Sequence, residues 1–164
     1  MAGNLYGLFD CAADDTLYPL VAATPGHACL YAGDIDPELA PAAPFIVEVR
    51  ETDPLLRAFL AEGHGKNWGI LCESRLSLSL VRFHFRHYLQ ARLPDKRVVE
   101  FRFYDPRVFR VYFPTCAPDE LVRWFDGITR FIVENEAGDG FLEYSLISGR
   151  LDVRPAKKPF INAR

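Results

Sequence analysis

The sequence lacks any apolar run close to the roughly 20 residues that a membrane-spanning helix needs. Its Lys and Arg residues form no stripe that would follow a nucleic-acid backbone, and the net charge is −3. The first residues, MAGNLYGLFDCAADD, have no cationic segment, and Asp10 interrupts their only apolar stretch. They therefore do not resemble a signal peptide. These absences predict a cytoplasmic protein that neither inserts into a membrane nor binds nucleic acid.

Cysteine is scarce and dispersed, with four residues at positions 11, 29, 72 and 116 and no CxxC pair. Zinc sites usually have ligands only a few residues apart. A chain of 164 residues, 49% of them hydrophobic, can bury a core without disulfides. We therefore expect reduced cysteines, no metal ion and no cofactor.

Aromatic residues are abundant, with 13 Phe, 7 Tyr and 2 Trp beside a single Met. Such rings either fill the core or face a partner, because aromatic residues are enriched at protein interfaces. The two tryptophans, Trp68 and Trp124, are therefore candidate partner-binding residues.

Strand and helix patterns interleave over about the first 125 residues, and two further strands follow a Gly-rich turn at 137–140. This order predicts a single α/β domain with a mixed central sheet flanked by helices. The expected strands are 4–9, 28–31, 45–49, 68–72, 97–104, 128–133 and 141–147, and the expected helices are 17–21, 54–60, 74–92, 106–113 and 118–125.

Residues 74–92 fit two patterns. Leucines alternate with serines at 76–80 as in a strand, whereas Val81, Phe85 and Leu89 follow helical spacing. A strand of this length would exceed the usual 3–10 residues, which favours the helix.

The length fits one domain, or two lobes that share a core. The turn at 94–96 offers a hinge between a lobe 1–94 and a lobe 95–147. Residues 148–164 follow as a C-terminal strand or tail, in which the last ten residues read as a tail.

The stretch FRFYDPRVFR at 101–110 combines the end of a strand with the start of a helix. Asp105 is a helix N-cap and Pro106 fits the first helical turn. Arg107 and Arg110 share a helix face and are available to a carboxylate in the fold or on a partner. In the expected strand, Phe101 and Phe103 lie on one face and Arg102 and Tyr104 on the other. Architecture accounts for the stretch best, with a binding surface as the next interpretation and catalysis as the last.

Candidate catalytic groups are few. His84 and His87 would share one face of a helix, a spacing that suits a metal ion or simply an amphipathic helix. No HExxH or GxSxG motif is present, and the loop Gly63–Lys66 lacks the remainder of a P-loop. A small hydrolase that uses His84, His87 or Asp105, with a cleft that collects these groups, is the alternative function.

Several motifs in order along the chain resemble the type VI secretion effector adaptor/chaperone family, whose members include the Tap and Tec proteins. The resemblance covers roughly 1–147, and FRFYDPRV is its most specific element. The motifs are LYGLFD at 5–10, LYPL at 17–20, PFIVEV at 44–49, WGILCES at 68–74, RFHFRHYLQARLPD at 82–95, FRFYDPRV at 101–108 and PDELVRWFDGITRFIVENEAGD at 118–139.

The resemblance implies a function of binding rather than catalysis. Such an adaptor binds one toxic effector protein in the cytoplasm and loads it onto the VgrG spike protein. One departure is Ala117, which stands where the family usually has an acidic cap before the proline. Either Thr115 caps that helix one turn earlier, or the helix start is weaker.

Overall fold

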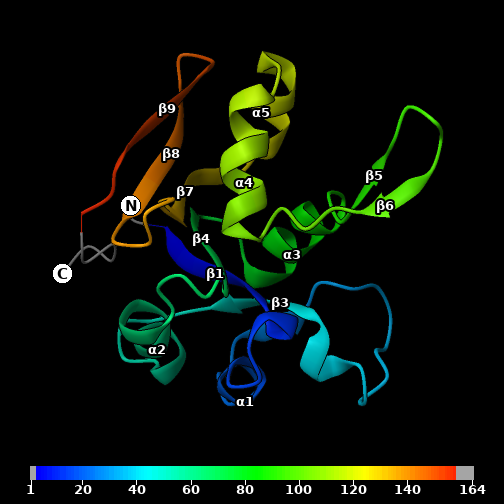
Figure 1. Ribbon diagram of the computed structural model, residues 1–164, viewed down its shortest axis with the longest axis vertical. Coiled ribbons are helices and arrows are strands. Elements are labelled where there is room, and N and C mark those ends of the chain that lie inside the picture. Colours follow the sequence, from blue (N-terminus) through cyan, green and yellow to red (C-terminus); the bar gives the residue numbers. More distant parts are fainter. Residues whose placement is uncertain (1–2, 158–164) are drawn as a thin grey trace.

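The computed structural model describes residues 3–157 and contains a central sheet of seven strands in the order β2-β3-β1-β4-β7-β8-β9 (Figure 1). The prediction of one α/β domain with a central sheet flanked by helices is confirmed. Every strand pair in the described sheet is antiparallel, where the sequence had indicated a mixed sheet. The strands are β1 (Asn4–Asp10), β2 (His27–Cys29), β3 (Pro44–Glu48), β4 (Gly69–Ser74), β7 (Ile128–Glu134), β8 (Phe141–Ile147) and β9 (Arg150–Pro155).

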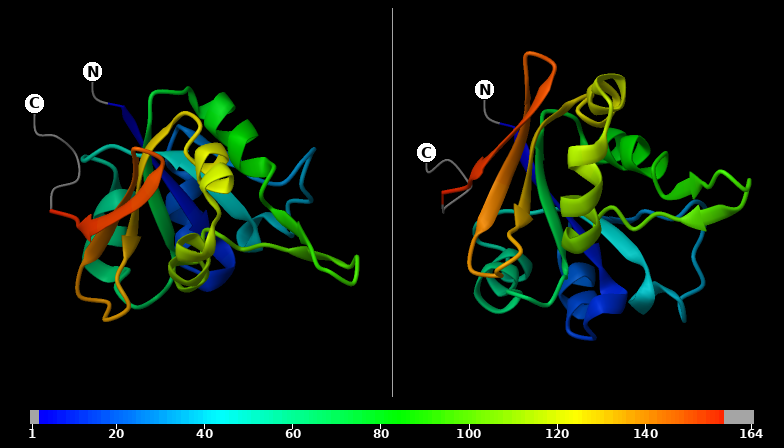
Figure 2. Two further views of the ribbon diagram at one scale, coloured as in Figure 1. Left: turned by 90° about the horizontal axis from the view of Figure 1, so that it is seen from above. Right: turned by 45° about the horizontal axis from the view of Figure 1, so that its top comes forward.

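Helices cover both faces of the sheet (Figures 1 and 2). Helices α1 (Leu17–Ala22) and α2 (Pro54–Glu62) pack on one face, and α3 (Leu78–Arg86), α4 (Pro106–Tyr112) and α5 (Pro118–Trp124) pack on the other. Short 3-10 turns lie at Cys11–Ala13, Ala40–Ala42 and Phe113–Thr115. Because both faces are covered, β1 is buried along nearly its whole length. None of the helices in residues 3–157 combines the length and the apolar character needed to cross a membrane.

The core beneath α3, α4 and α5 is built mainly from aromatic rings. Phe131 of β7 lies at its centre, with ring centroids between 5.2 and 6.0 Å from four other rings. The four rings are those of Phe85 in α3, Phe109 in α4, Phe113 in the turn after α4, and Phe125 directly after α5. The aromatic surplus of the sequence is therefore used largely to join three short helices to the sheet.

The other core is more aliphatic. Leu17 and Val21 of α1 and Leu55 of α2 pack against alternate residues of β1, β3 and β4. Trp68 lies in this second core, fully buried beside the start of β4.

The helix predicted over 74–92 is too long. α3 begins after Ser77, whose Oγ accepts a hydrogen bond from the Leu80 N–H at 3.5 Å, and it ends at Arg86. The chain then forms a hairpin of β5 (Gln90–Arg92) and β6 (Val98–Glu100), which turns at Lys96 with a φ of +68°. Periodicity did not reveal the change because Leu89 stays buried where a helix would also have buried it.

The β5–β6 hairpin, residues 90–100, projects from the body and is called the arm (Figure 1). Residues 94–96, where the sequence offered a hinge, are the tip of the arm. The sheet contains strands from both sides of this point, since β7 pairs with β4.

The strand predicted over 97–104 ends at Glu100. The Asp105 N–H donates to the Arg102 carbonyl oxygen at 3.0 Å, which turns the chain before α4. Alternation therefore fails, and Phe103 and Tyr104 are both buried rather than placed on opposite faces.

The predicted pair at 128–133 and 141–147 is confirmed as β7 and β8. β9 extends the sheet beyond them through a two-residue turn at Ser148 and Gly149, both with positive φ (50° and 76°). Of the predicted tail, residues 158–164 lie outside the described part of the chain.

Truncation of Phe131 tests the aromatic core. Phe131→Ala removes a ring that four others contact, so we expect a loss of about 3–5 kcal/mol in the free energy of unfolding. Urea denaturation followed by fluorescence would measure it. Val111→Ala, at a side chain 74% exposed on α4, is the control and should change stability by less than about 0.5 kcal/mol. A loss at Phe131 no larger than the control's would contradict this description of the core.

Candidate functional site

The stretch 101–110 lies mostly in the interior. Phe103 and Tyr104 are buried, and Pro106 is buried at the first turn of α4. Phe101 is half-buried, with its ring centroid 4.8 Å from that of Tyr112. The rings of this stretch thus hold α4 and the arm against the sheet.

The predicted cap at Asp105 is present. Its carboxylate accepts hydrogen bonds from the Arg107 N–H at 2.9 Å and from the Arg107 guanidinium at 3.1 and 2.7 Å. Burial raises the pKa of Asp105, but the hydrogen bonds and charge of Arg107 outweigh burial and lower that pKa below its ordinary value.

The arginines of the stretch bond within the protein. Arg102 forms an ion pair with the buried Asp10 of β1. Arg107 pairs with Asp105, and Arg110 donates to the Glu134 carbonyl oxygen at 2.7 Å. Arg102 and Arg107 keep exposed side chains, so they can also reach a partner, whereas Arg110 serves mainly to fix α4 to β7.

The two candidate tryptophans lie in separate cores, one on each face of the sheet. Trp68 Nε1 donates to Asp14 at 3.0 Å. Trp124 stacks on Tyr88 with centroids 3.6 Å apart, and this stacking joins α5 to the segment that leads into the arm. Neither indole ring is on the surface.

The four cysteines are free, and burial raises the pKa of each thiol, that of Cys11 to about 12. A thiol with a raised pKa is a poor nucleophile at neutral pH. The cysteines therefore contribute to packing and supply no activated group.

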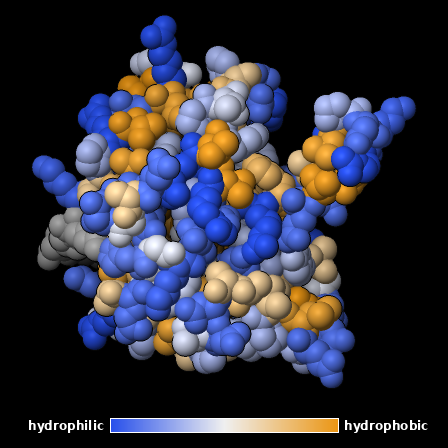
Figure 3. Space-filling view, in the orientation of Figure 1, coloured by the Kyte–Doolittle hydropathy of each residue, from blue (hydrophilic) through white to orange (hydrophobic). Residues whose placement is uncertain are grey.

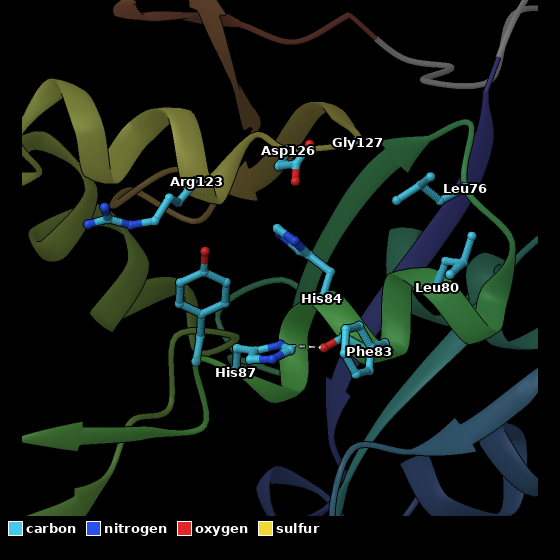
Figure 4. Close-up of a pocket in the computed structure, with 9 residues that line it drawn as sticks. Leu76, Leu80, Phe83, His84, His87, Arg123, Asp126 and Gly127 are labelled. Atoms are coloured by element: carbon cyan, nitrogen blue, oxygen red, sulfur yellow. Dashed lines mark hydrogen bonds between the residues drawn. The ribbon is translucent and has the colours of Figure 1, made fainter.

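One hollow of the surface is a groove between α3 and the connection from α5 to β7, with a cavity volume of about 560 Å³. Figure 4 shows Leu80, Phe83 and His84 of α3 on one side, opposite Arg123 and Asp126. Its lining is completed by Leu76, His87, Tyr88 and Gly127. We call this site the α3 groove.

The α3 groove is lined by unusually exposed apolar side chains. Phe83 is 63% exposed and Leu80 54% exposed. Together with His84 and His87 they follow a spacing of i, i+3, i+4 and i+7, so they form one continuous face of α3. The opposite face, with Val81 and Phe85, is fully buried. α3 therefore has two apolar faces, one in the core and one in solvent.

The floor of the α3 groove is fixed by Ser74, which is fully buried. Its Oγ donates to the Gly127 carbonyl oxygen at 2.6 Å and accepts from the Leu76 N–H at 3.0 Å. Gly127 has a φ of +76° and leaves room for the Leu76 side chain. This serine therefore has a structural role.

The histidines of the groove are also bonded to the backbone. His84 Nε2 lies 3.0 Å from the Trp124 carbonyl oxygen, and His87 Nδ1 lies 2.8 Å from that of Phe83. Burial lowers the pKa of His84, so its ring is neutral at pH 7. Within residues 3–157, no group of three or more His, Cys, Asp or Glu is placed to hold a metal ion.

The structure does not assemble the hydrolase trio. His84 and His87 line the α3 groove, whereas Asp105 is absent from its lining and is committed to Arg107 and the start of α4. The residues that the sequence analysis missed are Leu80 and Phe83. The helical face of Val81, Phe85 and Leu89 is buried as its spacing indicates, but nothing in the spacing marked Leu80 and Phe83 as a second, exposed apolar face.

The family described as Domain of unknown function (DUF4123) matches residues 5–123. The chain belongs to this family. No curated protein and no solved structure matches it. The DUF4123 match ends in α5, yet β7, β8 and β9 complete the same sheet, so the folded unit extends past the matched range.

The start of α5 lies inside the DUF4123 match and has Ala117 in place of an acidic cap. Thr115 Oγ1 donates to the Tyr112 carbonyl oxygen at 2.6 Å and does not cap α5. Glu120 instead reaches back and accepts from the Ala117 N–H at 3.4 Å. Half of a capping box is therefore present.

Asp105→Ala tests the cap. We expect a loss of about 1 kcal/mol in unfolding free energy at neutral pH, with any partner binding retained. Because the folded-state pKa is depressed, this stabilisation is present above the unfolded-state pKa and is lost as the pH falls through the folded-state value. The difference between wild type and variant should therefore shrink below about pH 4.

Urea denaturation at several pH values would measure this difference. Asp15→Ala, at an exposed carboxylate, should change stability by less than about 0.5 kcal/mol at any pH. An Asp105 effect independent of pH would show that the carboxylate charge is not what stabilises α4.

Proposed function

We propose that the protein is a non-enzymatic adaptor/chaperone that binds a cognate type VI secretion effector in the cytoplasm and loads it onto the VgrG spike. The resemblance carried by the ordered motifs supports the proposal. The DUF4123 match over residues 5–123 contains six of the seven motifs and the start of the seventh.

The observation that carries the proposal is the solvent-facing apolar surface of α3. A helix that exposes Leu80 and Phe83 beside a groove of about 560 Å³ has the character of a protein-binding site. A packed core on each face of the sheet supports the groove, so the groove is preformed before a partner binds. A preformed site loses less entropy on binding than one that must be ordered.

A small hydrolase remains the alternative of a different class, and the geometry favours it less. An acid/base or nucleophilic site needs side chains within hydrogen-bond reach of each other. In the α3 groove, both histidines bond to main-chain carbonyl groups, and Asp105 lies elsewhere.

A tagged pull-down from the lysate of the native bacterium tests the adaptor proposal. We expect one toxin-like protein, with or without the VgrG spike, to be recovered in stoichiometric amount and identified by mass spectrometry. Deletion of the gene should abolish secretion of that toxin while other effectors are still secreted. Recovery of the protein as a monomer, with unchanged effector secretion in the deletion strain, would refute the proposal.

A further inference from the structure

The surface around the α3 groove differs in charge from the rest of the chain. Residues 75–97 contain six Lys and Arg and one Asp, a net charge of +5, whereas the whole chain has −3. The remaining residues therefore sum to −8. A local excess of this sign attracts and orients an acidic partner.

Most of these cations have no acidic counterpart in the described part of the chain. Of the six, only Arg97 forms an ion pair with another residue between 3 and 157, and its partner is Asp95. Arg82 donates to the Cys29 and Tyr31 carbonyl oxygens. The unpaired members are Arg75, Arg86, Arg92 and Lys96.

The hollows beside α3 are continuous. The α3 groove shares Phe83 and His87 with a smaller hollow, which shares Arg86 and His87 with a third at the base of the arm. On the arm, Val98, 54% exposed, pairs with Arg92 and lies on the same strand face as Gln90 and Glu100, which line the third hollow. Figure 3 shows hydrophobic side chains on the projecting arm together with hydrophilic ones. Apolar side chains are thus bordered by cations from α3 to the arm.

Two carboxylates also border this surface. Glu100 accepts hydrogen bonds from Tyr31 at 2.8 Å and from Tyr104 at 3.4 Å, so it is engaged within the fold. Asp126 lies at the rim of the α3 groove. They leave the cations in excess.

We propose that the α3 groove and the arm bind an amphipathic helical segment of the partner protein, which places apolar side chains against Leu80 and Phe83 and carboxylates against Arg86 and Arg92. The inference rests on the proposed adaptor function and specifies the chemistry of the docked segment. A helix suits the site because α3 and the α5–β7 connection form the two walls of a groove. Strand addition suits it less, because β5 and β6 are only three residues long.

Photo-crosslinking identifies the occupant. A photoreactive phenylalanine analogue replaces Phe83 in the tagged full-length protein, expressed in the native bacterium, and mass spectrometry then sequences the attached peptide. We expect an apolar stretch of a second protein with several Asp and Glu. The same analogue at Val111, exposed on α4 and outside the groove, should not capture that stretch.

Affinity measurements test the charge and the anchor. The captured segment, synthesised with a fluorophore, would be titrated with wild-type protein and with three variants. Phe83→Ser should weaken binding roughly tenfold or more, because it removes a central apolar contact. The double variant Arg86→Glu/Arg92→Glu should weaken it by a similar factor at low salt and by less at high salt. Val111→Ser should bind like wild type.

The other outcomes separate the two proposals. Capture of a second copy of this chain, of its own C-terminal segment, or of a basic or uncharged peptide would overturn the inference. If a partner co-purifies with wild type and equally with Phe83→Ser, the inference is overturned, whereas the adaptor function still stands. Failure to recover any effector or spike protein would refute the adaptor function itself.

Discussion

The antiparallel pairing of β4 with β7 is the interaction on which the α3 groove and the arm depend. Everything between these neighbouring strands, residues 75–127, is an insertion that leaves the sheet at Ser74 and returns at Ile128. The buried hydrogen bond from Ser74 to Gly127 closes the base of this insertion. α3, the arm, α4 and α5 all belong to it, so this strand pair fixes where both walls of the α3 groove start and end, and the contacts of His84 and Tyr88 with Trp124 join the walls directly.

Much of the fold could be predicted from the sequence because strong local signals agreed with the tertiary structure. Asp-Pro steps placed the starts of α2 and α4, and apolar runs located β1, β3 and β4. The failures occur where burial does not follow a single period. After α3 ends at Arg86, the chain forms a hairpin and then a turn within a few residues, and Leu89 is buried just before the hairpin whereas Phe103 and Tyr104 are buried after it. Strand direction depends on long-range pairing, which local patterns do not contain.

The candidate site was less predictable than the fold. The aromatic residues of FRFYDPRV stood out, but their number reflects a core in which short helices are joined to the sheet by rings. Phe83 did not stand out, because a pattern that alternates Phe with Arg and His fits a strand as well as a helix with two apolar faces. Only packing shows that Phe85 is covered and Phe83 is not. The excess of positive charge over residues 75–97 was present in the sequence. Only the structure shows that this segment borders an apolar groove.

The position of β7 also orders events during synthesis. The strands β1, β3 and β4 can pair as soon as residue 74 has left the ribosome, whereas Phe131, which the rings of the insertion pack against, is made much later. Contacts between residues far apart in the chain form slowly because the intervening segment must first be closed into a loop. A nascent chain that has not yet reached β7 therefore carries α3 without the Phe131 ring that its buried Phe85 contacts. The exposed Leu80 and Phe83 are thus synthesised well before the strand that completes the core beneath α3.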